Sequence, residues 1–241
     1  MPIYNESDVL LKAKLKEWDK RNTYGLNLIV AQDGLEPRHW INDFNVTYAH
    51  FEQNYGRGGH RDRCVQSFTS DCEVFSWVDG DDWFDPIDIH SLCVKVFKSK
   101  HVWGYYSRKR RINVSNNNGS LMKFVEFINN KTKSMKFNNN LNSFHGTAFM
   151  SNAIKPSFEY VDRGEDSLWL KMFREQNNDC GLSVPINKDV GYVFFGNPNV
   201  AKKYNNQVGV HEDGSHYIYV KQKRVSISAE KARAIWIERH K

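Results

Sequence analysis

The stretch Glu73-Val74-Phe75-Ser76-Trp77-Val78-Asp79-Gly80-Asp81-Asp82 joins an apolar run directly to a tight group of acids. Residues 73–78 are rich in β-branched and aromatic side chains, which favours a buried strand. The carboxylates that follow repel one another, so a cation or several hydrogen bonds must compensate them. Mg²⁺ and Mn²⁺ prefer oxygen ligands, and Gly80 lets the backbone turn so that Asp79 and Asp81 face one ion. The stretch therefore indicates a divalent metal site or, as the alternative, a solvated loop in which Asp82 caps the next helix.

Strand and helix patterns alternate before this stretch. Apolar spacing predicts helices over 8–20 and 61–68 and strands over 26–31 and 45–49. Such alternation implies βαβ units and a mainly parallel sheet. Ligands of these sheets collect beyond the carboxyl ends of strands. The acidic turns at Asp33-Gly34 and at 79–82 therefore predict one common site.

The second half of the chain is less regular. Asn-rich runs at 116–119 and 138–140 predict turns, and the polar segment 197–216 predicts a loop. Helical spacing predicts three further helices, over 121–128, 165–173 and 228–239.

Composition limits the class of protein. The chain has 241 residues, a net charge of +6 and four cysteines without CxxC spacing. The cysteines are therefore expected to be free thiols rather than disulfides or zinc ligands. The positive charge favours anionic partners such as nucleotide phosphates, nucleic acid or acidic membranes. With no apolar run of the ~20 residues that cross a bilayer and no signal-peptide pattern, we expect a cytoplasmic protein.

Several segments carry a resemblance to one family. Residues 75–86 resemble the DXD-type segment of inverting GT-A glycosyltransferases of the family 2 type. In the same order, 2–5 is similar to the family's P-x-Y-N segment, 29–34 to its second strand, 54–62 to its glycine-containing helix entry and 164–166 to its G-E-D segment.

The resemblance covers roughly residues 2 to 216 and implies an α/β, GT-A (Rossmann-like) fold. Its mainly parallel central sheet would be flanked by helices and followed by a C-terminal helical tail. Residues 1–200 would form the glycosyltransferase domain, and residues 201–241 a C-terminal loop and helix that close over the donor site.

The resemblance also implies roles in binding the donor and the metal. Asp33 would bind the donor's base, Arg61 would lie near the nucleotide, and Asp79 would bind the ribose or a metal-bound water. Asp81 would bind the divalent metal, Mn²⁺ or Mg²⁺. A further metal or diphosphate contact would come from a C-terminal histidine, His211, with His216 as its competitor. Without the resemblance, an arginine on a helix and a histidine in a loop are both expected to be solvated.

For catalysis, the resemblance makes Asp166 the general base, with Glu165 beside it. The alternative is a helix N-terminus, where the macrodipole favours acids. His145 would lie in the acceptor region. Trp169 and Trp83 are candidates for stacking on sugar faces, with packing as the alternative role.

The function these calls predict is transfer of a sugar from a nucleotide-diphosphate sugar, by analogy a uridine-diphosphate sugar, to a glycan or polymer hydroxyl with inversion. A hydroxymethylated base of viral DNA is the alternative acceptor, because the basic run 108–111 lies beside Trp103, Tyr105 and Tyr106. A metal-dependent nuclease is a further alternative, in which Asp79 and Asp81 would hold two ions with Glu165 or Asp166.

Overall fold

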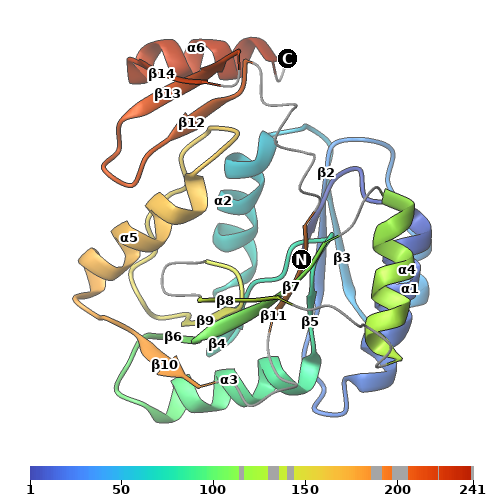
Figure 1. The fold of residues 1–241 in the computed structure, drawn as a ribbon. Coiled ribbons are helices and arrows are strands. Elements are labelled where there is room, and N and C mark those ends of the chain that lie inside the picture. The colour runs from blue at the N-terminus through green and yellow to red at the C-terminus, as the bar shows by residue number, and fades with distance from the viewer. Residues whose placement is uncertain are drawn as a thin grey trace.

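The computed structural model describes residues 1–113, 117–129, 136–139, 144–185, 192–196, 206–221 and 223–239 (Figure 1). It confirms an α/β fold with a parallel sheet at the N-terminal end of the chain. The middle strand of this sheet, Ile29–Asp33, pairs in parallel with one strand on each side. Its last residue, Asp33, pairs with Phe51. The elements of this part are β1 (Pro2–Ile3), α1 (Asp8–Arg21), β2 (Ile29–Asp33), the 3₁₀ helix η1 (His39–Asp43), β3 (Thr47–Phe51) and α2 (Gly56–Phe68).

A second, mixed sheet carries the strand that leads into the acidic loop. That strand pairs antiparallel with a strand far along the chain, so it does not extend the parallel sheet. The sheet order is β10 (Leu182–Val184), β6 (Trp103–Tyr106), β9 (Thr147–Met150) and β4 (Val74–Ser76). Two helices occur between the strands of this sheet along the chain: α3 (Pro86–Lys98) precedes β6, and α5 (Glu165–Asn177) lies between β9 and β10. The cap of α3 is Asp85, whose carboxylate accepts from the Ile87 amide at 3.1 Å, so Asp82 is not a helix cap.

A third sheet and a helix lie beside the acidic loop. The sheet order is β5 (Trp83–Phe84), β11 (Tyr192–Gly196), β7 (Arg108–Asn113) and β8 (Lys136–Asn139), and the helix is α4 (Asn117–Ile128). The Asn-rich runs were predicted as turns, and this is wrong for residues 117–119, which belong to α4, and for residues 138–139, which belong to β8. Packing overrides the turn preference of asparagine here, because α4 places Phe124 against Trp83 and Phe195.

The C-terminal part is a small antiparallel sheet covered by a helix. Its elements are β12 (Val208–Val210), β13 (His216–Val220), β14 (Lys223–Ile227) and α6 (Ala229–Arg239). The predicted helix is confirmed, whereas the segment predicted as a loop contains β12. Figure 1 shows this part next to α5 and the start of α2. It has a core of its own, which includes Val161, Leu168, Val210, Ala232 and Trp236.

Within the described residues, no helix is long and apolar enough to cross a membrane.

The junction between α5 and β12 depends on one glycine. Gly164 has a φ of +79° and leads directly into α5, and a Cβ there would lie 2.0 Å from the Val210 carbonyl oxygen. The amide of Val210 donates to the Arg163 carbonyl at 2.9 Å. The backbones of the two segments therefore touch, and this contact fixes the start of α5.

We expect Gly164→Ala to destabilise the protein far more than Gly214→Ala. Gly214 has a similar φ of +84° but open space around it, so it reports backbone strain alone, about 1 kcal/mol. Gly164→Ala adds a backbone clash, with a further cost of about 1–3 kcal/mol. Urea titration of both variants measures the difference in the free energy of unfolding, and equal losses would contradict the contact.

Candidate active site

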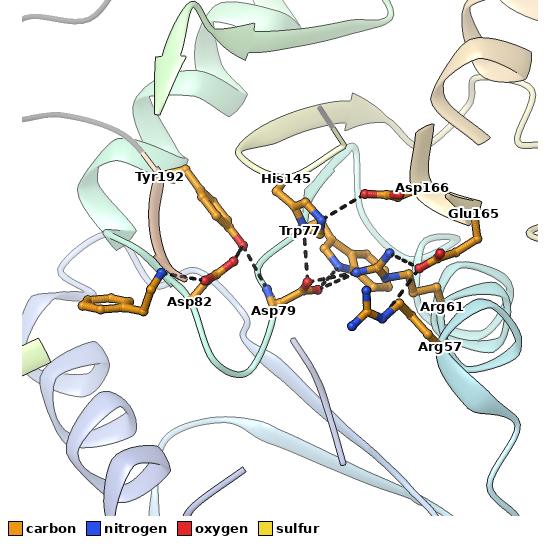
Figure 2. A network of polar contacts seen from close by, with 10 residues as sticks. Arg57, Arg61, Trp77, Asp79, Asp82, His145, Glu165, Asp166 and Tyr192 are labelled. Carbon is orange, nitrogen blue, oxygen red and sulfur yellow. Dashed lines mark hydrogen bonds and ion pairs between the residues drawn. The ribbon is translucent and has the colours of Figure 1, made fainter. Parts of the chain in front are cut away.

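The side chain of Arg61 is the centre of a buried ionic network (Figure 2). It is 2% exposed and lies between the acidic loop and α5. Its Nη2 donates to both carboxylate oxygens of Asp79, at 3.1 and 2.9 Å, and its Nη1 donates to Glu165 Oε1 at 2.6 Å. The expectation of a solvated helix arginine is therefore wrong, because α2 points this guanidinium inwards.

Two glycines explain how α2 comes so close to its neighbours. A Cβ at Gly58 would lie 1.9 Å from the Glu159 carbonyl oxygen, and a Cβ at Gly59 would lie 2.7 Å from the Tyr160 ring. Only a helix without side chains at these positions can pack there. The close packing carries Arg61, further along α2, into the space between the two carboxylates.

Asp79 is an ionised carboxylate in a crowded setting. Besides Arg61, it accepts from Trp77 Nε1 at 2.9 Å, and its Oδ2 lies 3.5 Å from His145 Nδ1. Burial alone would raise the pKa of Asp79, but the charge of Arg61, supported by His145, holds that pKa below its usual range. Asp79 therefore carries its charge across the neutral range.

Asp166 and His145 extend this network beyond the loop. His145 Nε2 lies 3.2 Å from Asp166 Oδ2, so the imidazole bridges Asp166 and Asp79. Burial would raise the pKa of Asp166, whereas the hydrogen bond with His145 and the charge of Arg61 keep it well below its usual range. The Asp166 side chain is still 25% exposed, so a substrate group can reach it.

The acidic loop contains one structural carboxylate and two that remain for a ligand. Asp82 is 1% exposed, and it accepts from the Tyr192 hydroxyl and, at 3.0 Å, from the Phe195 amide. Burial, followed by the charges of Asp81 and Asp79, raises the pKa of Asp82 well above its usual value. Asp81, in contrast, is exposed.

Lys14 also stabilises the acidic loop, through hydrogen bonds to its backbone. Its ammonium group is buried and donates to the carbonyls of Gly80 and Asp82 at 2.8 and 2.7 Å. Burial lowers the pKa of Lys14 to about 8. Lys14 was not among the predicted site residues, although its position in the helix marks it. Lys14 lies on the apolar stripe of α1, between Leu11 and Leu15.

Oxygen atoms of Asp79, Asp81 and Asp82 all lie within 4.8 Å of one another. This donor set fits a hard divalent cation such as Mg²⁺ or Mn²⁺. Because Asp82 is 1% exposed, whereas the Asp79 side chain is 22% exposed and Asp81 is exposed, Asp79 and Asp81 are the residues that would hold the ion.

Four of the predicted residues line one cavity of about 410 Å³: Asp33, Arg61, Asp79 and Asp81. The 2–6 segment, Asn54, Arg57 and Gln207 also line it. Asp33 is 2% exposed, and its Oδ2 accepts from the Tyr55 amide at 2.9 Å. Its Oδ1 has no hydrogen-bond partner in the described structure. Burial raises the pKa of Asp33 to about 6. The cavity is therefore lined by a buried carboxylate oxygen that can accept a hydrogen bond from a ligand.

Two predicted sugar-stacking residues are in the core instead. Trp169 is 1% exposed and stacks on Phe158 and Phe173, with its Nε1 donating to the Pro156 carbonyl. Trp83 is 3% exposed. The acceptor-binding role predicted for Trp169 is wrong, because no face of its ring is accessible.

One further prediction needs correction, and another stays open. Glu165 is 1% exposed and held by Arg61, with Arg57 at 3.8 Å, so its carboxylate fixes the network rather than touching substrate. The ring of His211 packs on Tyr217 at 4.5 Å between centroids. The role of His211 as a metal or diphosphate contact stays a prediction.

Comparisons with known proteins point to one family. A sequence model described as glycosyl transferase family 2 matches residues 1–157. Among solved structures, S. aureus TarS 1–349 is similar, with a TM-score of 0.55 and 12% sequence identity. The match covers 80% of this chain and 58% of that one, and it concerns the fold. A search of curated proteins gave no match.

We expect Arg61→Met to lower the free energy of unfolding by about 3–5 kcal/mol, because it leaves two buried carboxylates without their cation. Arg57→Met is the matched control. It removes a cation from the same helix near the same Glu165, but the Arg57 side chain is 54% exposed, so a loss of at most about 1 kcal/mol is expected. Urea unfolding measures both, and similar losses would show that Arg61 is not the central ion.

Asp33→Asn is expected to stabilise the protein at neutral pH. The folded-state pKa of Asp33, about 6, lies above the ordinary 3.8, so the ionised form costs stability above about pH 6. That cost decreases as the pH falls from about 6 towards 3.8, and it is lost below 3.8, where both states bind the proton. The gain should be about 2–3 kcal/mol near pH 7.5 and absent near pH 3.5. Urea titrations across this range test it, with the exposed Asp43→Asn as control, and a pH-independent gain would refute the assignment.

Proposed function

The chain belongs to glycosyl transferase family 2, and we propose that it transfers a sugar from a nucleotide-diphosphate sugar to a hydroxyl group of a glycan or other polymer, with inversion and with Mn²⁺ or Mg²⁺. One observation carries this proposal: a single cavity joins the buried acceptor Asp33 to Asp79 and Asp81. His145 links Asp79 to the partly exposed Asp166.

The nucleotide of the donor would occupy the cavity, whose volume lies in the usual range of small-molecule sites. Asp33 Oδ1 would accept a hydrogen bond from an N–H group of the base. Uracil offers such a group at its N3 position, which is why a uridine-diphosphate sugar is the donor we favour. Arg57 also lines the cavity and would face the diphosphate with a positive charge.

The metal would be held by Asp81 and Asp79 at the other side of the cavity. Its contribution when bound is to neutralise the charge that develops on the departing diphosphate. The protein prepares this position in two ways. Lys14 and Tyr192 fix the loop, and Arg61 keeps Asp79 ionised and oriented.

Asp166 would act as the general base. Its carboxylate takes the proton of the acceptor hydroxyl while the oxygen attacks the anomeric carbon from the side opposite the diphosphate. The bond between that carbon and the phosphate oxygen breaks, and the diphosphate leaves with the electron pair. His145 orients Asp166 through the 3.2 Å contact, so we assign it a positioning role rather than the acceptor contact predicted from the sequence.

The sequence also left two alternatives open, a nuclease and a transferase with a DNA acceptor. A nuclease would need Asp79 and Asp81 to hold two cations with Glu165 or Asp166. Arg61 already lies between Asp79 and Glu165, and membership of a glycosyltransferase family favours sugar transfer instead. A DNA acceptor was inferred from the basic run 108–111, whose side chains fall outside the described structure. We therefore favour a glycan or polymer. Gln207, just before β12, lines the cavity, which supports closure of the C-terminal part over the donor.

Thermal unfolding with a panel of nucleotide-diphosphate sugars, each with and without Mn²⁺, tests the proposal. A ligand that binds only the native state raises the melting temperature. We expect a metal-dependent rise with a uridine donor. Asp81→Ala should abolish that rise, and Asp166→Asn should keep it.

Release of nucleoside diphosphate in the presence of glycan polymers measures turnover, which Asp166→Asn should lower by about 10²–10⁴-fold. The base assignment fails if Asp166→Asn transfers sugar at the normal rate. Absence of a metal-dependent shift with every donor would refute the donor site.

A further inference from the structure

A second group of metal-ligating side chains lies at the far end of α5 from Asp166. Ligand atoms of His101, Asp179 and Cys180 all lie within 4.8 Å of one another. Asp179 and Cys180 follow α5, and His101 lies before β6. A helix of 13 residues is about 20 Å long, so this cluster is separate from the acidic loop and its cavity.

The backbone around the cluster is held firmly. Asp179 Oδ2 accepts from the Val102 amide at 2.7 Å, and Oδ1 accepts from the Gly181 amide at 2.9 Å. Trp103 Nε1 donates to the Asp179 carbonyl at 3.2 Å. Gly181 has a φ of +79° and lies flat on the Trp103 indole, where a Cβ would come within 2.3 Å. The loop with two of the three ligands is thus preorganised, as a metal site requires.

The ligand atoms of His101 and Asp179 already lie side by side. His101 Nδ1 is 2.7 Å from Asp179 Oδ1, so one cation could contact both atoms. The His101 side chain is 34% exposed and Cys180 is exposed, so an ion has access from solvent. The other three cysteines are buried or half-buried and lie outside this cluster.

The position in the fold also favours a cation. The cluster follows the C-terminus of α5, where the macrodipole is negative. The Asp179 carboxylate already accepts from two backbone amides and contacts His101, and a bound cation would add positive charge at the helix end.

We propose that His101, Asp179 and Cys180 bind one thiophilic divalent cation of the Zn²⁺ class. Sulfur and imidazole ligands select such ions over Mg²⁺, whereas the all-oxygen acidic loop has the opposite preference. Three protein ligands leave the fourth position to water. The ion would join the end of α5 to the start of β6, and thereby stabilise the helix whose first turn carries Asp166. The site is independent of the proposed sugar transfer.

Zn²⁺ titration of the full chain in excess Mg²⁺, which occupies the acidic loop, tests this site by calorimetry. Wild-type protein should bind one Zn²⁺ ion, and Cys180→Ser should weaken the affinity by about 10-fold or more. Cys72→Ser, which changes a free cysteine outside the cluster, should bind like wild type. Zn²⁺ should also raise the melting temperature of wild type but not of Cys180→Ser, whose melting temperature without metal shows whether it folds.

Co²⁺ provides a direct readout of the ligand. Wild type and Cys72→Ser should show a thiolate-to-cobalt charge-transfer band, and Cys180→Ser and His101→Ala should lose or weaken it. The proposal is overturned if Cys180→Ser binds Zn²⁺ as tightly as wild type, or if saturating Co²⁺ gives wild type no such band. Loss of Zn²⁺ binding in Asp81→Ala, with Cys180→Ser unaffected, would place the ion at the acidic loop instead.

Discussion

The buried guanidinium of Arg61 is the constraint on which the arrangement of this protein depends. A charge with 2% exposure is tolerated only when its partners are charged and well placed, and Arg61 has Asp79 on one side and Glu165 on the other. These partners come from the acidic loop and from the first turn of α5. The ion pairs therefore fix the distance between the proposed metal-binding loop and the proposed base, Asp166, which directly follows Glu165.

The carboxylates of the acidic loop differ because their surroundings differ. Asp82 is buried against Tyr192 and a backbone amide, and its pKa is raised by burial. Asp79 is kept ionised by Arg61 despite burial, which by itself would raise its pKa. Asp81 is exposed. One residue thus builds the loop, one is oriented by the protein, and one faces solvent. Lys14 supplies the charge beneath them, since its ammonium donates to two loop carbonyls.

The elements that could be predicted from the sequence are those that local residue patterns determine. The sequence located β4 and the acidic turn, the Asp33 turn and the helix that begins at Glu165, because apolar runs, glycines and acids mark these elements directly. It did not predict that Arg61 is buried or that Trp169 belongs to an aromatic core, since burial depends on contacts with distant segments. The C-terminal strands were missed although the sequence marks them. β13 is rich in aromatic and β-branched residues, and in β14 Val225 and Ile227 alternate with polar residues.

Burial and charge repulsion at the donor site lower the stability of the folded protein when no ligand is bound. Asp33 presents an acceptor oxygen without a hydrogen-bond partner, and burial disfavours its charge. The carboxylates near Asp81 add mutual repulsion that a cation relieves. A nucleotide would supply the missing hydrogen-bond donor, and a divalent ion would supply the missing positive charge. Binding of the two ligands would therefore stabilise the folded protein. Arg61, by contrast, already has both terminal nitrogens bonded to carboxylates, although its Nε has no hydrogen-bond partner in the described structure. The ion pairs of Arg61 thus form without a ligand, whereas Asp33 Oδ1 lacks a partner at the position where the base of the donor is expected.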